Sequence, residues 1–195
     1  LLDLRVVLAA AQQSLHRLSD SQLDALLRVQ VQPLRPYLQS LARHARELAD
    51  TIGREVDVAV DAGDSRLDRR IVEALREAFL HLVRNAVDHG VEPTEERAAA
   101  GKSSRGRITL RAQGEGGRVR IEVADDGRGI DCSRIREAAA EGGLVPADQL
   151  DRMGSDELHQ LVFLPGFSTR EETSALSGRG IGMDAVAQAV RGVGG

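Results

Sequence analysis

Residues 81–90, HLVRNAVDHG, place imidazole, amide and carboxylate side chains at helical spacing. At 3.6 residues per turn, His81, Asn85, Asp88 and His89 fall on one side of a helix, while apolar residues face the other side. An imidazole titrates near neutral pH and can therefore move a proton. A solvated surface is the plain alternative, but amides and imidazoles favour helices less than Lys or Glu. We therefore expect one face of this helix to be packed and the other to carry chemistry.

A second polar string, DDGRGID, occupies residues 125–131 directly after an alternating, strand-like run. Asp125 at the end of that strand supplies a hydrogen-bond acceptor, which suits the exocyclic amine of adenine. Gly127 and Gly129 let the backbone of the following turn approach a ligand closely. Asp-Gly pairs also mark ordinary turns, so this string on its own favours a turn over a binding site.

A glycine cluster, SGRGIGMDAV, covers residues 177–186 and opens a predicted helix. Gly178, Gly180 and Gly182 leave the unpaired N–H groups of the helix start free of side chains, which makes an anion site suited to phosphates. Glycines also serve loops generally. The cluster is not a Walker loop, because no Lys follows it, and it lacks the strand-turn-helix order of a Rossmann fingerprint.

A long loop at residues 164–177 precedes the glycine cluster, and loops of this length are typical of lids or disordered segments. Phe167 could latch such a lid against the body of the protein. Plain core filling by this phenylalanine explains its presence equally well.

The elements that must position these groups begin with two helical runs of apolar residues, at 1–18 and 23–52. Together they predict a helical hairpin over residues 1–52, with Pro33 and Pro36 kinking or breaking the second helix. Two helices bury little surface alone, so the hairpin needs either the following domain or a second copy of itself. We favour the second copy, a homodimer joined in a four-helix bundle.

A second domain is expected over residues 53–195. Residues 54–63 alternate as a strand, 66–89 form a long helix, and a short helix lies near 94–100 in a polar loop. Two alternating runs, RITLRAQ and RVRIEVAD, flank GEGG and predict a β-hairpin. Helices follow at 132–141, 155–163 and 181–191. Helices layered on a mostly antiparallel sheet correspond to the α+β class.

The composition excludes several classes of protein. The formal net charge of the 195 residues is -4, so there is no basic field to bind nucleic acid. Every basic residue except Lys102 is Arg, which we attribute to coding bias. Cys132 is the single cysteine, so an internal disulfide is impossible. Without a membrane-spanning run or a secretory signal, we expect a cytoplasmic protein with no membrane insertion.

The motifs occur in one order: HLVRNAVDHG, DDGRGID, LPGFST and GRGIGMDAV. This order and wording resemble the nucleotide-binding domain of the GHKL superfamily, specifically of the chemotaxis histidine kinase CheA family. The resemblance covers residues 54–195. More loosely, residues 33–58 resemble the passage that joins that family's dimerisation hairpin to its catalytic domain.

The resemblance implies a Bergerat-type two-layer α/β sandwich that binds Mg-ATP under a mobile lid. It makes Asn85 the Mg²⁺ ligand, places His81 at the γ-phosphate and His89 at the phosphates, and makes Asp125 the acceptor for the adenine amine. The further positions that it assigns to the nucleotide are Asp88, Gly127, Gly129, Ser168, Thr169, Gly178, Gly180, Ile181, Gly182 and Met183. The acceptor would be a histidine on a separate phosphotransfer domain, and the further partners a response regulator and a receptor or coupling protein.

This sequence departs from the family in three respects. Ala138 and Gly142 stand where the chemotaxis kinases usually carry lysines for the phosphates, so Arg134, Arg136 or Arg170 would have to substitute. We expect the last strands, which close the sheet in this family, to be absent from residues 1–195. His16 and His44 are not set in an acceptor motif, and we interpret both as surface helix residues.

Three functions follow from these observations. The first is an ATP-dependent protein-histidine kinase core. The second is an ATPase like the gyrase, Hsp90 and MutL relatives, but these carry Glu in place of His81 to activate water, and Glu77 lies one turn too early. The third is a nucleotide-binding regulatory module or pseudokinase, which the missing lysines keep open.

Overall fold

The computed structural model of the chain describes residues 31–167 and 182–195. The first 30 residues, and with them the first helix of the expected hairpin, lie outside the described residues. In chain order the elements are β1 (Val31–Pro33), α3 (Leu34–Thr51), β2 (Val56–Asp61), β3 (Arg66–Asp68), α4 (Arg69–Ala74), α5 (Arg76–Asn85), the π-helical turn η1 (Ala86–Gly90), α6 (Thr94–Ala99), β4 (Gly106–Glu115), β5 (Arg118–Asp125), α7 (Cys132–Glu141), α8 (Ala147–Leu150), α9 (Ser155–Leu161) and α10 (Met183–Gly192).

The main sheet is mixed rather than mostly antiparallel. Over the described residues its strand order is β2-β4-β5, with β2 parallel to β4 and β4 antiparallel to β5. The expectation fails at the β2–β4 pair because the chain crosses from β2 to β4 through helices, and such a crossover permits parallel pairing. A separate short ladder pairs β1 with β3.

The predicted β-hairpin is confirmed as β4 and β5. The ladder runs to the pair Glu115 and Arg118, so the connection is the two residues Gly116 and Gly117. Their φ angles of 55° and 82° are the positive values that a tight hairpin turn requires.

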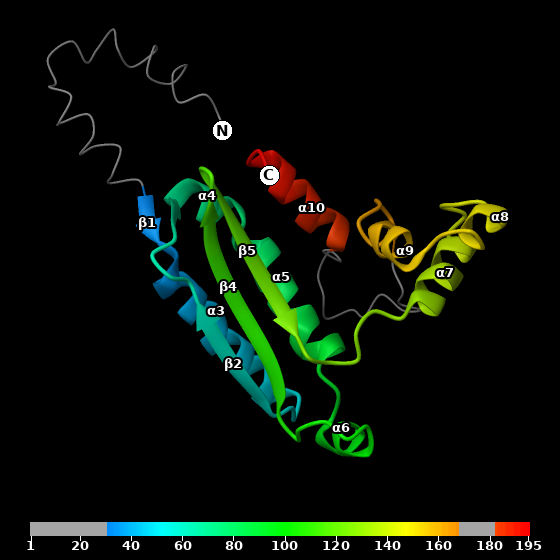
Figure 1. Cartoon of the computed structure of the whole chain (residues 1–195), viewed down its shortest axis with the longest axis horizontal. Coiled ribbons are helices and arrows are strands. Elements are labelled where there is room, and N and C mark those ends of the chain that lie inside the picture. The colour runs from blue at the N-terminus through cyan, green and yellow to red at the C-terminus, as the bar shows by residue number, and fades with distance from the viewer. Residues whose placement is uncertain (1–30, 168–181) are drawn as a thin grey trace, which may run out of the picture.

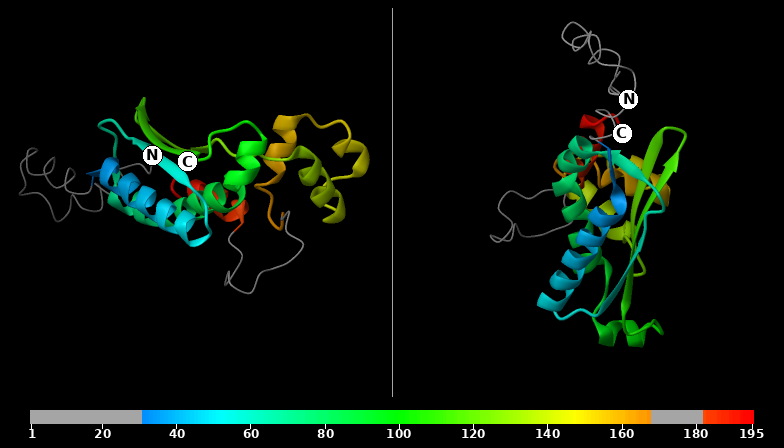
Figure 2. Two further views of the ribbon diagram at one scale, coloured as in Figure 1. Left: turned by 90° about the horizontal axis from the view of Figure 1, so that it is seen from below. Right: turned by 90° about the vertical axis from the view of Figure 1, so that its left-hand side faces the viewer.

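Helices α3, α5 and α10 cover one face of this sheet, as the edge-on views in Figure 2 show. Along β4 the buried residues alternate with exposed or half-buried ones, which is the period-two pattern of a half-covered sheet. Cross-strand ion pairs occupy the other face, where Arg111 lies 3.4 Å from Asp61 and 3.7 Å from Glu122. The class is therefore α+β, as expected, with helix and sheet packed in two layers.

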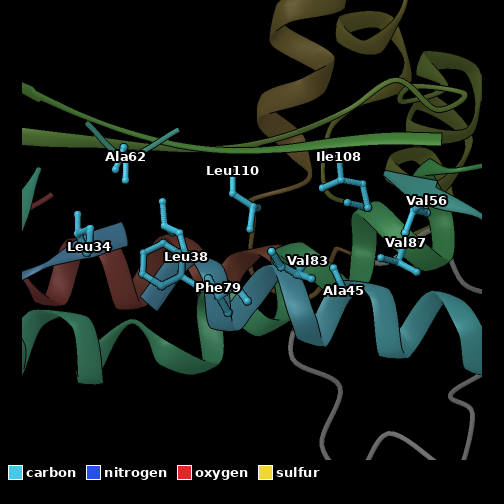
Figure 3. Close-up of a cluster of buried hydrophobic side chains, with 14 of the residues drawn as sticks. Leu34, Leu38, Ala45, Val56, Ala62, Phe79, Val83, Val87, Ile108 and Leu110 are labelled. Carbon is cyan, nitrogen blue, oxygen red and sulfur yellow. The ribbon is translucent and has the colours of Figure 1, made fainter. Parts of the chain in front are cut away.

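The core lies between the sheet and α3, α5 and η1. Figure 3 shows Ile108 and Leu110 of β4 directed toward the helices, with Leu38 of α3 and Val83 of α5 opposite them. All four residues belong to one cluster of buried side chains. Burial of these apolar surfaces is the main stabilising term for such a layered fold.

The packing of α3 corrects the expected domain boundary at residue 53. Leu34 and Leu38 are 0% and 1% exposed within the same cluster as the sheet residues. Pro33 stands at the N-cap of α3, so this helix begins at Leu34. Residues 34–51 therefore use the following domain as their complement, the arrangement that sequence analysis ranked second to a partner copy.

The helix expected at residues 66–89 is also divided. Its first three residues form β3, and Asp68 then caps α4 by accepting a hydrogen bond from the Arg70 backbone N at 2.7 Å. At the other end, the Val91 N donates to the Ala86 O at 2.9 Å, five residues back, so the last turn widens into a π-helix.

A second, smaller core joins α7, α8 and α9. Its buried members are Ile135, Ala139, Leu150, Leu158 and Leu161, and Phe167 packs against them. In Figure 1 these helices stand beyond the far end of β5, away from α3.

None of the described helices combines the length and apolarity needed to cross a membrane.

Substituting Leu38 with Ala tests whether α3 belongs to the core of this domain. Leu38 is 1% exposed, so we expect Leu38→Ala to lower the free energy of unfolding by about 2–5 kcal/mol through lost burial and a residual cavity. Chemical denaturation followed by circular dichroism measures this change. Gln39→Ala, at an exposed position on the same helix, is the control and should leave stability nearly unchanged. Equal stability of the two variants would place α3 outside the core.

Candidate functional site

The polar face predicted at residues 81–90 begins with a side-chain pair on α5. His81 Nε2 and Asn85 Nδ2 lie 3.0 Å apart, one helical turn from each other. The same Nδ2 also contacts Met183 Sδ at 3.4 Å. Met183 opens α10, so this contact joins two motifs separated by 98 positions in the chain. The amide oxygen of Asn85 is thereby turned away from His81 and Met183.

The π-helical turn carries the rest of this polar face. Ala86 and Val87 are buried against the core, whereas Asp88 and His89 are exposed. The His89 Nε2 lies 3.6 Å from the Asp88 Oδ2. The wider turn rotates these two side chains relative to an α-helix, and π-turns of this kind are frequent at functional sites.

Asp125 meets the end of η1 at Gly90. A methyl group on Gly90 would lie 2.7 Å from the carboxylate of Asp125, and one on Gly127 would collide with the carbonyl oxygen of Gly90. The Arg128 N donates to that carbonyl at 3.0 Å, and the Gly127 N donates to Asp125 Oδ1 at 3.0 Å. Gly127 is therefore required for the close approach of two backbone segments, whereas a methyl group on Gly90 would displace the Asp125 carboxylate. Gly129, with a φ of 72°, is required for its left-handed turn.

The start of α10 supplies the third part of the site. Gly182 stands at its N-cap in an extended conformation. Because Met183, the first residue of α10, contacts Asn85, the first backbone N–H groups of this helix lie close to Asn85. The predicted helix is confirmed with a start at residue 183 rather than 181. Five predicted nucleotide positions lie outside the described residues: Ser168, Thr169, Gly178, Gly180 and Ile181.

An ion cluster behind Asp125, built on the buried residues Glu92 and Arg97, was not predicted from the sequence. Arg97 is 1% exposed and lies 3.0 Å from Glu92 and 2.9 Å from Asp126, and Lys102 lies 2.7 Å from Glu92. Burial raises the pKa of Glu92, but hydrogen bonds from Lys102, its own backbone and Arg97 outweigh that effect and lower the pKa to about 2. Burial also opposes ionisation of Asp126, yet bonds from Arg107 and Arg97 hold its pKa below the usual range. The one available signal was Lys102, the sole lysine of the chain.

The positions where the family usually has lysines lie on the second core. Ala138 is half-buried on α7 and Gly142 caps its C-terminal end. Of the arginines considered as substitutes, Arg136 donates to the Leu150 O at 3.2 Å and is thereby tied to α8. Arg134 is exposed. Arg170 lies outside the described residues.

Two surface hollows lie away from these groups. One lies between α3 and α5 beside Tyr37 and Arg76, and the other lies over the ends of β2 and β4 beside Asp61 and Gln113. Neither contains a predicted site residue. The candidate site lies instead where the ends of α5 and β5 and the start of α10 bring the predicted side chains together.

Taken together, the end of α5, the end of β5 and the start of α10 offer three complementary chemistries. An imidazole and an amide lie side by side, a carboxylate faces a bare glycine backbone, and a helix N-terminus opens next to them. A ligand with a hydrogen-bonding ring and a negatively charged tail fits this set. The arrangement defines a nucleotide-binding class of protein.

The chain belongs to the family described as histidine kinase-, DNA gyrase B-, and HSP90-like ATPase, whose model matches residues 71–195. That membership implies ATP binding and confirms the predicted superfamily.

Similarity to individual proteins confirms the resemblance of the chain to the CheA family. The chain is 37% identical over 183 residues to "Chemotaxis protein CheA" of Rhizobium meliloti (strain 1021), which covers 94% of the chain and 24% of that relative. It is 42% identical over 172 residues to "Gliding motility regulatory protein" of Myxococcus xanthus, covering 88% and 22%. It is also 35% identical over 162 residues to "Sensor histidine kinase CheAY" of Helicobacter pylori (strain ATCC 700392 / 26695), covering 83% and 20%. The chain thus spans about a quarter of the length of these relatives or less.

Gly127→Ala tests whether the close approach of the two glycines forms the ATP site. The added methyl would strike the Gly90 carbonyl and push the loop away from η1. We expect ATP affinity to fall by about tenfold or more, with a stability loss of about 1–3 kcal/mol from overpacking. Isothermal titration calorimetry measures the affinity. Gly114→Ala is the matched control, because a methyl there meets open space on β4 at a φ that any residue can adopt. Unchanged ATP affinity in Gly127→Ala would contradict this site.

Proposed function

We propose that this chain is the ATP-binding catalytic core of a protein-histidine kinase that transfers the γ-phosphoryl group of ATP to a histidine on a separate phosphotransfer domain. The bond from the γ-phosphorus to the β–γ bridging oxygen breaks, a bond to the acceptor imidazole nitrogen forms, and ADP leaves. The contacts of Asn85 with His81 and with Met183 carry the proposal, because they join the predicted metal ligand, the γ-phosphate position and the start of the helix that follows the glycine cluster.

The residues present fit Mg²⁺ as it occurs beside nucleotides. Magnesium prefers oxygen donors and is usually held by one or two protein groups together with phosphates and water. Among the described residues no cluster of three or more His, Cys, Asp or Glu side chains could hold a metal ion. Asn85, with its amide nitrogen turned to His81 and Met183, would present its oxygen to the ion. When bound, the ion would neutralise charge on the transferred group.

The remaining roles divide between base and phosphates. Asp125 would accept a hydrogen bond from the adenine amine beside Gly90. His81 would contact the γ-phosphoryl group or take up the acceptor proton, since an imidazole titrates near neutrality. His89 and the N-terminus of α10 would contact the phosphates. Catalysis in this scheme is positioning and charge neutralisation.

Two alternatives compete with this proposal. An ATPase needs a carboxylate that activates water, and position 81 is an imidazole paired with Asn85, which argues for the kinase. A nucleotide-binding regulatory module without efficient transfer is favoured by Ala138 and Gly142, since neither side chain can neutralise phosphate charge. Binding without transfer to any acceptor would select the regulatory module.

The whole protein's partners follow from the same proposal. They are a histidine phosphotransfer domain in cis or trans, a response regulator, and a receptor or coupling protein, in a cytoplasmic chemosensory system. A homodimer formed through the segment before α3 remains our proposal for assembly.

Asn85→Ala tests the metal and nucleotide roles together. We expect magnesium-dependent ATP affinity to fall by about tenfold or more, because an oxygen ligand of the ion is lost. Calorimetric titration with and without Mg²⁺ measures this dependence, and thermal melting checks the fold. Arg84→Ala, at the preceding exposed position of α5, is the control. The same Mg²⁺-dependent affinity in Asn85→Ala and in the unmodified chain would count against the assignment.

Transfer itself requires an acceptor. With γ-labelled ATP and the phosphotransfer domain of a CheA relative supplied in trans, we expect acid-labile, base-stable label on the acceptor, as for phosphohistidine. His81→Ala should reduce the rate of labelling by about 10²-fold or more if His81 takes up the acceptor proton. ATP binding without any labelling of the acceptor would instead establish the regulatory module.

A further inference from the structure

The ion cluster of Glu92, Arg97, Lys102 and Asp126 joins two buried residues, Glu92 and Arg97, to the loop that follows β5. Arg97 donates to the Glu92 Oε2 at 3.0 Å, to the Asp126 Oδ2 at 2.9 Å and to the Ser103 carbonyl at 2.7 Å. Longer bonds reach the carbonyl oxygens of Arg105 at 3.3 Å and Asp126 at 3.4 Å. One buried guanidinium thus joins α6, the start of β4 and the end of β5.

Lys102 adds a second hold on the same loop. Its Nζ lies 2.7 Å from the Glu92 Oε1, 2.8 Å from the Gly127 carbonyl and 3.1 Å from the Asp126 carbonyl. An ammonium group has three donors, and each has an acceptor here. Two successive peptide groups, those that follow Asp126 and Gly127, are therefore held by one side chain that is 32% exposed.

The cluster and the predicted adenine contact lie on opposite sides of one strand end. Consecutive residues of a strand point to opposite faces, so the Asp125 carboxylate faces Gly90 while that of Asp126 faces Arg97. The Arg107 N donates to the Asp126 Oδ1 at 2.8 Å, and the Asp126 N donates back to the Arg107 O at 3.0 Å. A shift of Asp126 would accordingly move Asp125.

Stability alone is a weak reason for such a cluster. Removing charges from water costs about as much as their attraction returns, so apolar residues of similar size would commonly stabilise the fold equally well. Directed hydrogen bonds do what apolar packing does not, because they fix the position of a backbone segment to within a bond length.

We propose that Lys102 and Arg97 are positioning residues for nucleobase selection: by clamping Asp126 and the Gly127 carbonyl, they hold the Asp125 carboxylate where it accepts from the 6-amino group of a purine. The inference rests on the proposed role of Asp125. It assigns the choice of adenine over a 6-oxo purine to residues that do not contact the base.

The test compares ATP with inosine triphosphate, which carries an oxygen in place of the 6-amino group. A hydrogen bond to a charged acceptor distinguishes the two, so we expect the unmodified chain to bind ATP about 10- to 100-fold more tightly by calorimetry. Asp125→Asn should remove most of this preference. Lys102→Met should reduce it by about fivefold or more while the melting temperature stays near that of the unmodified chain.

Glu95→Gln is the matched control. Glu95 is an exposed residue of α6, two positions before Arg97, so the variant removes a negative charge from the same helix without touching the clamp or the loop after β5. It should keep the full preference. Arg97→Met removes every hydrogen bond of the buried guanidinium and can fail to fold, which is why Lys102→Met decides the question.

The outcomes separate the two proposals. No preference for ATP in the unmodified chain would overturn the role of Asp125 and the inference with it. A preference lost in Asp125→Asn but intact in Lys102→Met would overturn the positioning role alone. Equal weakening of both nucleotides in Lys102→Met would show a structural role only, and it would also overturn the inference.

Discussion

The close contact between the Gly127 loop and the Gly90 carbonyl is the constraint on which the site depends. The end of η1 and the end of β5 come from segments about 35 residues apart, and each carries part of the polar chemistry. At Gly127 only backbone fits, since a methyl group there would strike the Gly90 carbonyl, and a methyl group at Gly90 would displace the Asp125 carboxylate. The two glycines therefore set the distance between the His81–Asn85 pair and Asp125.

The rest of the fold brings these ends to the same edge. The helical crossover from β2 to β4 makes those strands parallel and lays α5 across the covered face, with its C-terminal end toward the end of β5. Apolar burial of Val83 and Val87 against Ile108 fixes the rotation of α5 and η1 about their axis. Because the opposite side of the helix must then face outward, His81 and Asn85 are directed to the site by packing and not by their own contacts alone.

Sequence periodicity was sufficient for β2, the β4–β5 hairpin, α6, α7, α9 and α10, because each is a short element whose pattern of burial repeats at a single period. It was insufficient where a tertiary contact decides. The sequence pattern predicts a helix at residues 66–68, but these residues pair with β1. The hydrogen bond from the Val91 N to the Ala86 O, which makes the π-helical turn, has no counterpart in the spacing of apolar residues. The assignment of α3 to a separate unit failed because a helical seam shows that a face is buried and does not show which surface buries it.

The residues of the site likewise fall into those that the sequence indicated and those that it did not. His81 and Asn85 were visible because imidazole and amide side chains are unusual on a helix, whereas Asp125 and Gly127 favoured an ordinary turn until the order of the motifs showed the resemblance to the kinase family. The cluster of Arg97 and Glu92 was hidden, since charged residues in a polar loop normally face water. Lys102 was noticed as the sole lysine, but only the prevalence of arginine was interpreted, as coding bias. Lys102 sits where a compact ammonium reaches three oxygen atoms at once, a geometry that a planar guanidinium does not reproduce.

The clamp on Asp126 also bears on how the second core is joined to the first. From Asp126 the chain runs through Gly129 to Asp131, whose carboxylate caps α7 by accepting from the Ser133 N at 2.8 Å. The α7–α9 unit has a buried cluster of its own and no buried residue in common with the main one over the described residues. Ala138 and Gly142 lie on that unit, so the usual lysines are missing from the part of the protein that is packed separately. Every proposed nucleotide contact that the structure describes accordingly lies on the main core, on α10 or on the loop fastened by Arg97 and Lys102, and base selection and metal binding do not require α7 to move.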